Sequence, residues 1–308
     1  MLDPFQKTIL ETVIFKGIGL HSGLKAEVKI IPSAENNGII FKRIDLEKNN
    51  IIKANFDNVC SAKLCTTLQN KSGVTVSTVE HLLAALYITG IDNALIEISN
   101  SEVPIMDGSS KEFVESISKV GVKNLGAKRK YLKITKKFEL KENEKVISIE
   151  PNTEGLKVHF ELVYSNNVIG TQSNRINFMD EDLTDVYTSR TFCLFEDIEK
   201  IKKIGLAKGG SLENAVVVKE DKILNSEGLR NNKEFVNHKI LDLAGDFLLS
   251  GHRILGKVKC TQGGHSLTNS FLRAIFNDRS NFVTIELEES ISKKKYFKTP
   301  INKLAVNA

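Results

Sequence analysis

His238 and Asp242 stand four positions apart in a stretch with the apolar periodicity of a helix. That spacing puts both side chains on one helical face, close enough together to share a metal ion. A catalytic zinc site takes three ligands from imidazole, thiolate and carboxylate groups and keeps a fourth position for water. The pair alone is weak evidence, because helices often carry such residues as ordinary surface contacts. It therefore indicates a candidate metal site that needs a third ligand.

An internal similarity supplies a candidate for that third ligand. Residues 77–98 align with residues 238–259 at an offset of 161 positions, which places His81 on Asp242. If the two helices pack face to face, His81, His238 and Asp242 converge on one point. Two imidazoles and one carboxylate form a suitable zinc set.

Glu80, directly before His81, adds a group that can move protons. A carboxylate beside a metal ligand can take the proton of a water molecule that attacks the substrate. Ser77-x-x-Glu80 also matches a capping box, in which the glutamate accepts a backbone hydrogen bond at its own helix end. The two roles are not fully compatible, because a capping glutamate points back along its helix.

His265 lies between Gly263-Gly264 and Ser266, in what the sequence indicates is a loop. With an ordinary pKa near 6.5, a histidine there can deliver a proton to a leaving group. Asp246 follows Asp242 by four positions and can orient His265 and stabilise its charged form. The alternatives are that His265 is an ordinary solvated loop residue and that Asp246 is an ordinary surface carboxylate.

Three further residues could contact a substrate. Lys239 points to one flank of the candidate site, where its ammonium group can meet a phosphate. Thr191 can donate its hydroxyl to an oxyanion. Phe192 can pack on the ligand beside it.

The elements that must position these residues indicate an internal duplication. Residues 26–43 and 146–162 both alternate apolar and polar side chains around a Pro-x-x-Glu turn, at an offset of 119. This pattern is typical of strand, turn and strand. The helical offset is larger by 42 positions (161 minus 119), so the second unit carries an insert. Chance similarity between two β-hairpins is the alternative explanation.

We therefore predict two similar α+β units, joined between about residues 124 and 130, where Gly126 and a basic run interrupt the pattern. The insert falls between about residues 185 and 222. It is expected to form a strand, a short helix and a strand that project from the core.

The composition is that of an ordinary globular protein. Hydrophobic residues are 41% and charged residues 26% of the 308 residues, which excludes a disordered chain, a collagen and a coiled coil. The net charge is +5, and the densest basic runs, Lys128–Lys130 and Lys293–Lys295, are short. We expect a solvated basic surface and no nucleic-acid partner. A modest positive field would favour capture of an anionic substrate.

The cysteines and the apolar stretches predict a cytoplasmic location. Cysteines at positions 60, 65, 193 and 260 form no C-x-x-C pair, so a sulfur-rich zinc site is not expected. The N-terminal residues lack the apolar core of a signal peptide. The longest apolar stretch, Leu82–Ile88, is far shorter than the roughly 18 residues that span a bilayer. We therefore expect free thiols and no membrane-spanning segment.

Five segments together resemble one family, the UDP-3-O-acyl-N-acetylglucosamine deacetylases of lipid A synthesis. The resemblance runs from about residue 5 to about residue 300. The segments are Gly17–Gly23, Ser77–Leu86, Pro104–Ser109, Ser189–Phe192 and His238-Lys239-x-x-Asp242.

The resemblance implies an α+β fold in which two similar β-α domains form a β-α-α-β sandwich, each with an insert. The domains would be residues 1–126, with Glu80 and His81, and residues 127–308, with the acyl-chain insert near 190–220. The implied reaction is zinc-dependent hydrolysis of the N-acetyl group of UDP-3-O-acyl-N-acetylglucosamine, which releases acetate in the committed step of lipid A biosynthesis. Ferrous iron is the alternative metal, and a monomer is expected.

The resemblance also implies a role for each candidate in the reaction. The zinc ligands would be His81, His238 and Asp242. Glu80 would be the general base, and Thr191 would steady the oxyanion.

On the same grounds, His265 would be the general acid, with Asp246 as its partner. Phe192 would lie near the glucosamine ring, and Lys239 near the substrate head-group. The insert would form a passage for the fatty acyl chain. Its apolar walls would include Leu194, Ile198, Leu212 and Val217.

Two other classes of protein are rivals to this interpretation. A metal-stabilised binding protein would unfold when zinc is removed, whereas the enzyme would lose turnover and keep its fold. A small-molecule kinase would need a glycine-rich phosphate loop that opens a helix. The nearest candidate, Lys208-Gly209-Gly210-Ser211, lacks the required spacing.

Overall fold

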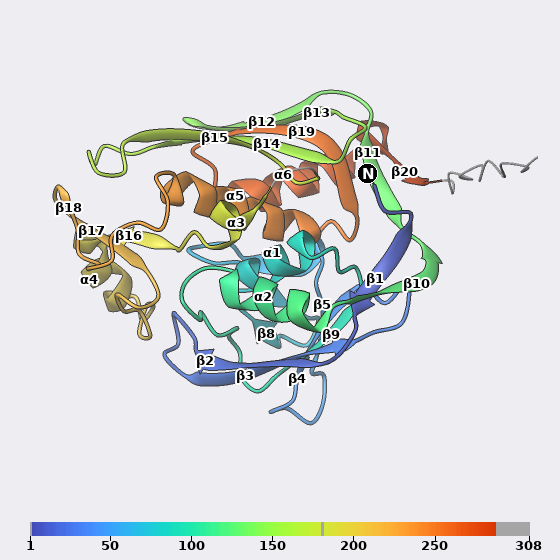
Figure 1. Ribbon diagram of the computed structural model, residues 1–308, viewed down its shortest axis with the longest axis horizontal. Coiled ribbons are helices and arrows are strands. Elements are labelled where there is room, and N and C mark those ends of the chain that lie inside the picture. The colour runs from blue at the N-terminus through green and yellow to red at the C-terminus, as the bar shows by residue number, and fades with distance from the viewer. Residues whose placement is uncertain (1, 180–181, 288–308) are drawn as a thin grey trace, which may run out of the picture.

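The computed structural model describes residues 2–179 and 182–287. The basic run Lys293–Lys295 and the end of the expected second domain, residues 288–308, lie outside the described residues. Two large sheets with helices between them form the body of the molecule (Figure 1). The expected mixed α+β class is confirmed.

The first large sheet has five strands in the order β2-β3-β9-β4-β5. They are β2 (Val13–Ile18), β3 (Lys25–Pro32), β9 (Ala94–Ile98), β4 (Ile39–Arg43) and β5 (Ile51–Lys53). Buried and more exposed residues alternate along β3, β4 and β9, as expected when one face of a sheet packs on a core.

The second large sheet has seven strands. They are β12 (Phe138–Glu142), β13 (Lys145–Pro151), β19 (Arg253–Thr261), β14 (Leu156–Val163), β15 (Thr171–Asn177), β11 (Lys130–Ile134) and β20 (Phe282–Glu286). The long strand β19 pairs with β13, β14 and β11, so it is the centre of this sheet.

The two sheets share one strand order. In the second sheet β12, β13, β19, β14 and β15 follow one another as β2, β3, β9, β4 and β5 do in the first. The two strands of each similar segment do not pair as a hairpin. Instead, β9 in the first sheet and β19 in the second lie between them. Each of these strands is antiparallel to one neighbour and parallel to the other. The inserted strand comes from a distant part of the chain, so local alternation could not reveal it.

The longer helices of the body lie between the large sheets (Figure 1). They are α1 (Glu80–Ile88), α2 (Lys111–Val120), α5 (Glu234–Leu248) and α6 (His265–Asn277). Helices α1 and α5 are buried over almost their whole lengths. Gly245 permits their close approach, since a β-carbon there would lie 2.1 Å from the carbonyl oxygen of Glu80. This contact holds the N-terminal turn of α1 against the C-terminal part of α5.

Smaller elements complete the described structure. A two-stranded ribbon joins β1 (Phe5–Ile9) to β10 (Val122–Lys128). One three-stranded sheet contains β6 (Val59–Ser61), β7 (Thr67–Gln69) and β8 (Thr75–Val76). The other contains β16 (Phe192–Leu194), β17 (Val216–Lys219) and β18 (Lys222–Ile223), with α4 (Phe195–Lys203) beside it. Short turns of helix are α3 (Thr184–Tyr187), η1 (Phe56–Asn58) and η2 (Arg279–Asn281).

The segment with β16, α4, β17 and β18 extends from one side of the body (Figure 1). No helix in residues 2–179 and 182–287 is long and apolar enough to cross a bilayer.

Candidate metal centre and active site

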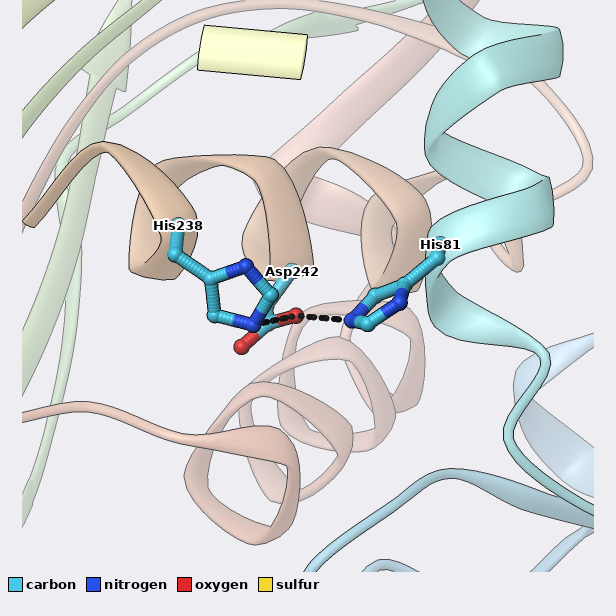
Figure 2. Close-up of side chains that lie close together, drawn as sticks. All are labelled: His81, His238 and Asp242. Carbon is cyan, nitrogen blue, oxygen red and sulfur yellow. Dashed lines mark ion pairs between the residues drawn. The ribbon is translucent and has the colours of Figure 1, made fainter. Parts of the chain in front are cut away.

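His81, His238 and Asp242 lie together where α1 meets α5 (Figure 2). Their candidate ligand atoms all lie within 4.8 Å of one another, and all three residues are buried. Asp242 Oδ1 is 3.5 Å from His81 Nε2 and 3.4 Å from His238 Nε2. The two imidazole rings meet nearly edge to face, with centroids 4.9 Å apart.

The hydrogen bonds around these residues suit a cation. His238 Nδ1 lies 3.1 Å from the carbonyl oxygen of Ser189, which can only accept, so Nδ1 carries the proton. His238 Nε2 therefore turns a lone pair toward Asp242. Asp242 Oδ1 is buried and accepts no hydrogen bond from the described residues. A buried, unpaired carboxylate oxygen between two imidazole nitrogens fits a bound divalent metal ion.

The surrounding charges keep Asp242 ionised. Burial by itself would raise its pKa, but His238 when protonated, and the charges of Lys239 and His265, outweigh burial and hold the pKa well below its ordinary value. Burial lowers the pKa of His238 to about 3, so that imidazole is neutral at physiological pH. A negative carboxylate and a neutral imidazole are the forms that bind metals.

Glu80 lies in the first turn of α1, next to the ligand set. Its Oε2 accepts a hydrogen bond of 3.0 Å from the Thr66 amide, and its Oε1 is 3.7 Å from His265 Nε2. The capping-box alternative fails, because no side chain caps α1. Burial raises the pKa of Glu80, although His265 and His81 oppose this shift.

His265 does not lie in a loop as expected, because it is the first residue of α6. Its Nδ1 is 2.8 Å from Asp246 Oδ2, and Asp246 Oδ1 accepts a 2.7 Å hydrogen bond from the Thr66 hydroxyl. Burial alone would lower the pKa of His265. The carboxylates of Asp246, Glu80 and Asp242 outweigh burial and raise that pKa to about 10.

Lys239 and Phe192 lie beside the ligand set. Lys239 Nζ donates to Asp242 Oδ2 over 2.9 Å and lies 5.7 Å from the centroid of the Phe192 ring. Burial would lower the pKa of Lys239, but Asp242 outweighs burial and raises it. The Phe192 ring packs edge-on against Phe235, with centroids 4.9 Å apart. The ammonium group therefore faces both the ligand set and an aromatic surface.

Thr191 lies at an apolar cavity, next to Phe192. Its amide donates to the Gly108 carbonyl over 2.8 Å, and its side chain lines a cavity of 390 Å³ together with Phe192. Other predicted wall residues in this lining are Ile198, Leu212 and Val217.

Leu194 is not in that lining and packs against the hydrophobic core. Cys193, its neighbour in β16, lines the cavity instead.

Two residues that shape the site are not among those predicted from the sequence. Thr66 contacts both Glu80 and Asp246 from a segment remote in sequence. The fully buried Arg190 donates to Glu234 Oε1 over 2.8 Å, which ties the start of the insert to the start of α5. The Ser189–Phe192 motif contains Arg190, so a basic residue inside an otherwise uncharged motif was the available signal.

His21 is a further residue without an assigned role. It is buried, it lines the 390 Å³ cavity, and its Nε2 has no hydrogen-bond partner among the described residues. The candidate phosphate loop Lys208–Ser211 lies in turns between α4 and β17 and opens no helix.

The fold and the site together define an α+β protein with a candidate metal centre, a buried carboxylate and a histidine of raised pKa beside it, and an apolar cavity lined by Phe192. The family model described as UDP-3-O-acyl N-acetylglycosamine deacetylase matches residues 6–277. The chain therefore belongs to this family.

Relatives from several bacteria agree with that assignment. The chain is 40% identical to the UDP-3-O-acyl-N-acetylglucosamine deacetylase of Geotalea uraniireducens over 302 residues, 98% of each chain. It is 41% identical to the protein of that name from Geobacter sp., over 92% of each chain. It is 40% identical to the protein of that name from Pseudoalteromonas translucida, over 89% of this chain and 91% of the relative.

Proposed function

We propose that this chain carries out the reaction of its family through the groups gathered at α1, α5 and α6. The chain is a deacetylase of lipid A biosynthesis that hydrolyses the N-acetyl group of UDP-3-O-acyl-N-acetylglucosamine and releases acetate. The observation that carries the mechanism is the convergence of two imidazoles and one carboxylate from two distant helices.

The family implies a metal cofactor, and we propose zinc, with ferrous iron as the alternative. His81, His238 and Asp242 would hold the ion. When bound, such an ion supplies a Lewis acid that polarises the amide carbonyl and lowers the pKa of a coordinated water.

Glu80 acts as the general base. Its Oε1 faces the space next to the ligand set, whereas the Thr66 amide holds Oε2 in place. Burial raises the pKa of Glu80, so the carboxylate is a stronger base than an exposed glutamate. It accepts a proton from the water that attacks the acetyl carbonyl.

His265 acts as the general acid. Asp246 holds its Nδ1 and keeps the ring charged, and Nε2 faces the side of Glu80 and Asp242. The proton on Nε2 passes to the departing glucosamine nitrogen, so a neutral amine leaves. Thr191 donates its hydroxyl to the oxyanion that forms during the attack.

The remaining candidates bind the substrate. Phe192 offers a flat apolar face to the glucosamine ring, and Lys239 offers positive charge to the substrate head-group. The 390 Å³ cavity receives the 3-O-acyl chain, with walls that include Ile198, Leu212 and Val217. Leu194 supports these walls from the core side.

The overall organisation is also part of the proposal. Residues 1–126 would form one α+β domain and residues 127–308 a second, layered as a β-α-α-β sandwich. The equal strand order of the two large sheets supports this division. We further propose a cytoplasmic monomer, whose mass is measured by light scattering during gel filtration.

The decisive experiment measures acetate release from UDP-3-O-acyl-N-acetylglucosamine by the purified protein, together with its metal content. We expect about one zinc or iron per chain, and turnover that stops when a chelator removes the metal. Full turnover by metal-free protein would contradict the mechanism. Absence of acetate release from metal-loaded protein would contradict the function.

A further inference from the structure

The outer face of the seven-stranded sheet carries a cluster of basic side chains far from the residues of the active site. Buried Val158 and Val258 face the helices, so their neighbours in β14 and β19 face outward. The outward residues are Lys157 and His159 of β14, Arg175 of β15, and Lys257 and Lys259 of β19. We call these five residues the outer-sheet basic patch.

Strand register fixes the shape of this patch. His159 is directly opposite both Lys259 and Arg175, which makes one row across three strands. Lys157 is opposite Lys257 and begins a second row. With neighbouring strands about 4.8 Å apart and alternate residues about 7 Å apart, the patch covers roughly 10 by 7 Å.

Carboxylates near the patch leave much of its charge unneutralised. Lys157 pairs with Glu154 over 2.6 Å. Glu150 is opposite Lys257 in register, but it forms its ion pair with Lys137, over 3.6 Å.

Glu161 lies two positions after His159, and Glu139 lies on the far strand β12. Among the described residues, no carboxylate forms an ion pair with Arg175, Lys257 or Lys259. Like charges directly opposite one another destabilise a sheet. Burial, Arg175 and Lys259 together lower the pKa of His159, in keeping with a local positive field.

The patch also borders a hollow. Both rows line a surface cavity of 800 Å³, larger than the cavity beside Phe192, and Lys137, Glu139 and Glu150 also contribute to its lining. Of the apolar residues in its lining, Val158, Ile176 and Val258 are buried and Val146 is half-buried, so the lining offers a partner protein little exposed apolar surface. The opposite face of the same strands packs on α5, so the sheet itself separates the patch from the metal ligands (Figure 1).

We propose that the outer-sheet basic patch binds a compound that carries two or more phosphate groups. Several cations at fixed spacings on a rigid sheet complement several negative charges, and the patch is wider than one phosphate can bridge. Such binding would relieve the repulsion between the two rows. The proposed deacetylation does not depend on this site, so either proposal can fail without the other.

The test uses isothermal titration calorimetry of the whole metal-loaded protein with inorganic tripolyphosphate as the probe. The variant K257Q/K259Q removes two charges from the patch. The control variant K119Q/K123Q removes two exposed charges from α2 and β10. Any removal of metal by the probe affects all three proteins equally, so the difference between variants reports the patch.

We expect K257Q/K259Q to weaken tripolyphosphate binding at least tenfold and the control to change it less than twofold. Raising the salt from 25 to 150 mM should weaken wild-type binding strongly, and orthophosphate should bind much more weakly than tripolyphosphate. Acetate release should be unchanged in both variants, and the thermal midpoint should not fall in either, because K257Q/K259Q removes like charges that lie opposite other cations. Equal affinities in the two variants, no binding at all, or binding only to phosphatidylglycerol vesicles would each overturn the proposal.

Discussion

Gly245 of α5 and Glu80 of α1 touch through their backbones: a β-carbon on Gly245 would lie 2.1 Å from the Glu80 carbonyl oxygen and 3.0 Å from the Ala84 amide nitrogen. The neighbour of Glu80 is His81, and His238 and Asp242 precede Gly245 on its helix. This one contact therefore sets how closely the ligands from the two helices approach.

Gly245→Ala should force α1 away from α5 and weaken metal binding. Helix propensity alone would favour alanine by about 1 kcal/mol. Overpacking of a close backbone contact costs roughly 1–3 kcal/mol, so we expect net destabilisation. Metal affinity, measured by competition with a chromophoric chelator, should fall about tenfold or more. Gly126→Ala is the control, because its β-carbon would meet nothing closer than 3.5 Å; equal losses in both variants would refute this reasoning.

Glu80→Ala should leave the metal content nearly unchanged and lower kcat by about 10²–10⁴-fold, the usual contribution of a positioned base. Metal content is measured by atomic absorption, and kcat by acetate release. Glu112→Ala, which removes an exposed carboxylate from the first turn of α2, serves as the control. Loss of the metal from Glu80→Ala would make Glu80 a ligand and contradict its role as base.

His265→Ala should lower the rate of amide hydrolysis by roughly 10²–10⁴-fold, because the leaving amine then lacks its proton donor. The metal ligands remain in this variant. Measuring kcat for both proteins at equal metal content isolates the effect. A variant that kept wild-type kcat would exclude His265 as the acid.

The pH dependence of kcat should be bell-shaped. The rate rises with pH as Glu80 loses its proton, at a pH above the ordinary glutamate range because burial raises the pKa of Glu80. It falls at higher pH as His265, whose pKa is raised, loses its proton. Asp246→Asn removes a negative charge that raises this pKa, so its alkaline limb should shift to lower pH. An unshifted alkaline limb would speak against the Asp246–His265 pair.

Removing the metal should abolish turnover while most of the fold persists, because the large sheets and helices form a continuous apolar core. Ligand binding stabilises only the native state, so the thermal midpoint should decrease moderately rather than vanish. Circular dichroism melts with and without a chelator measure this. Complete unfolding on chelation would favour the metal-stabilised binding protein instead.

The short-range features of the site were predictable from the sequence. A helix places residues four positions apart on one face, so His238 and Asp242 were expected to face the same way, and they do. The nearness of Glu80 to His81 and the five family motifs required no knowledge of the fold. The same holds for the alternation in β3 and β14, since strand geometry repeats every two residues.

The long-range features depended on the tertiary structure. Local alternation could not show that β9 and β19 insert between strands that are neighbours in sequence, because that pairing joins distant segments. Thr66 meets Asp246 across 180 positions, and no spacing rule relates them. Local periodicity was therefore enough to predict which groups can do the chemistry. Only the packing of α1 on α5 and the register of β14, β15 and β19 decided which of those groups lie side by side.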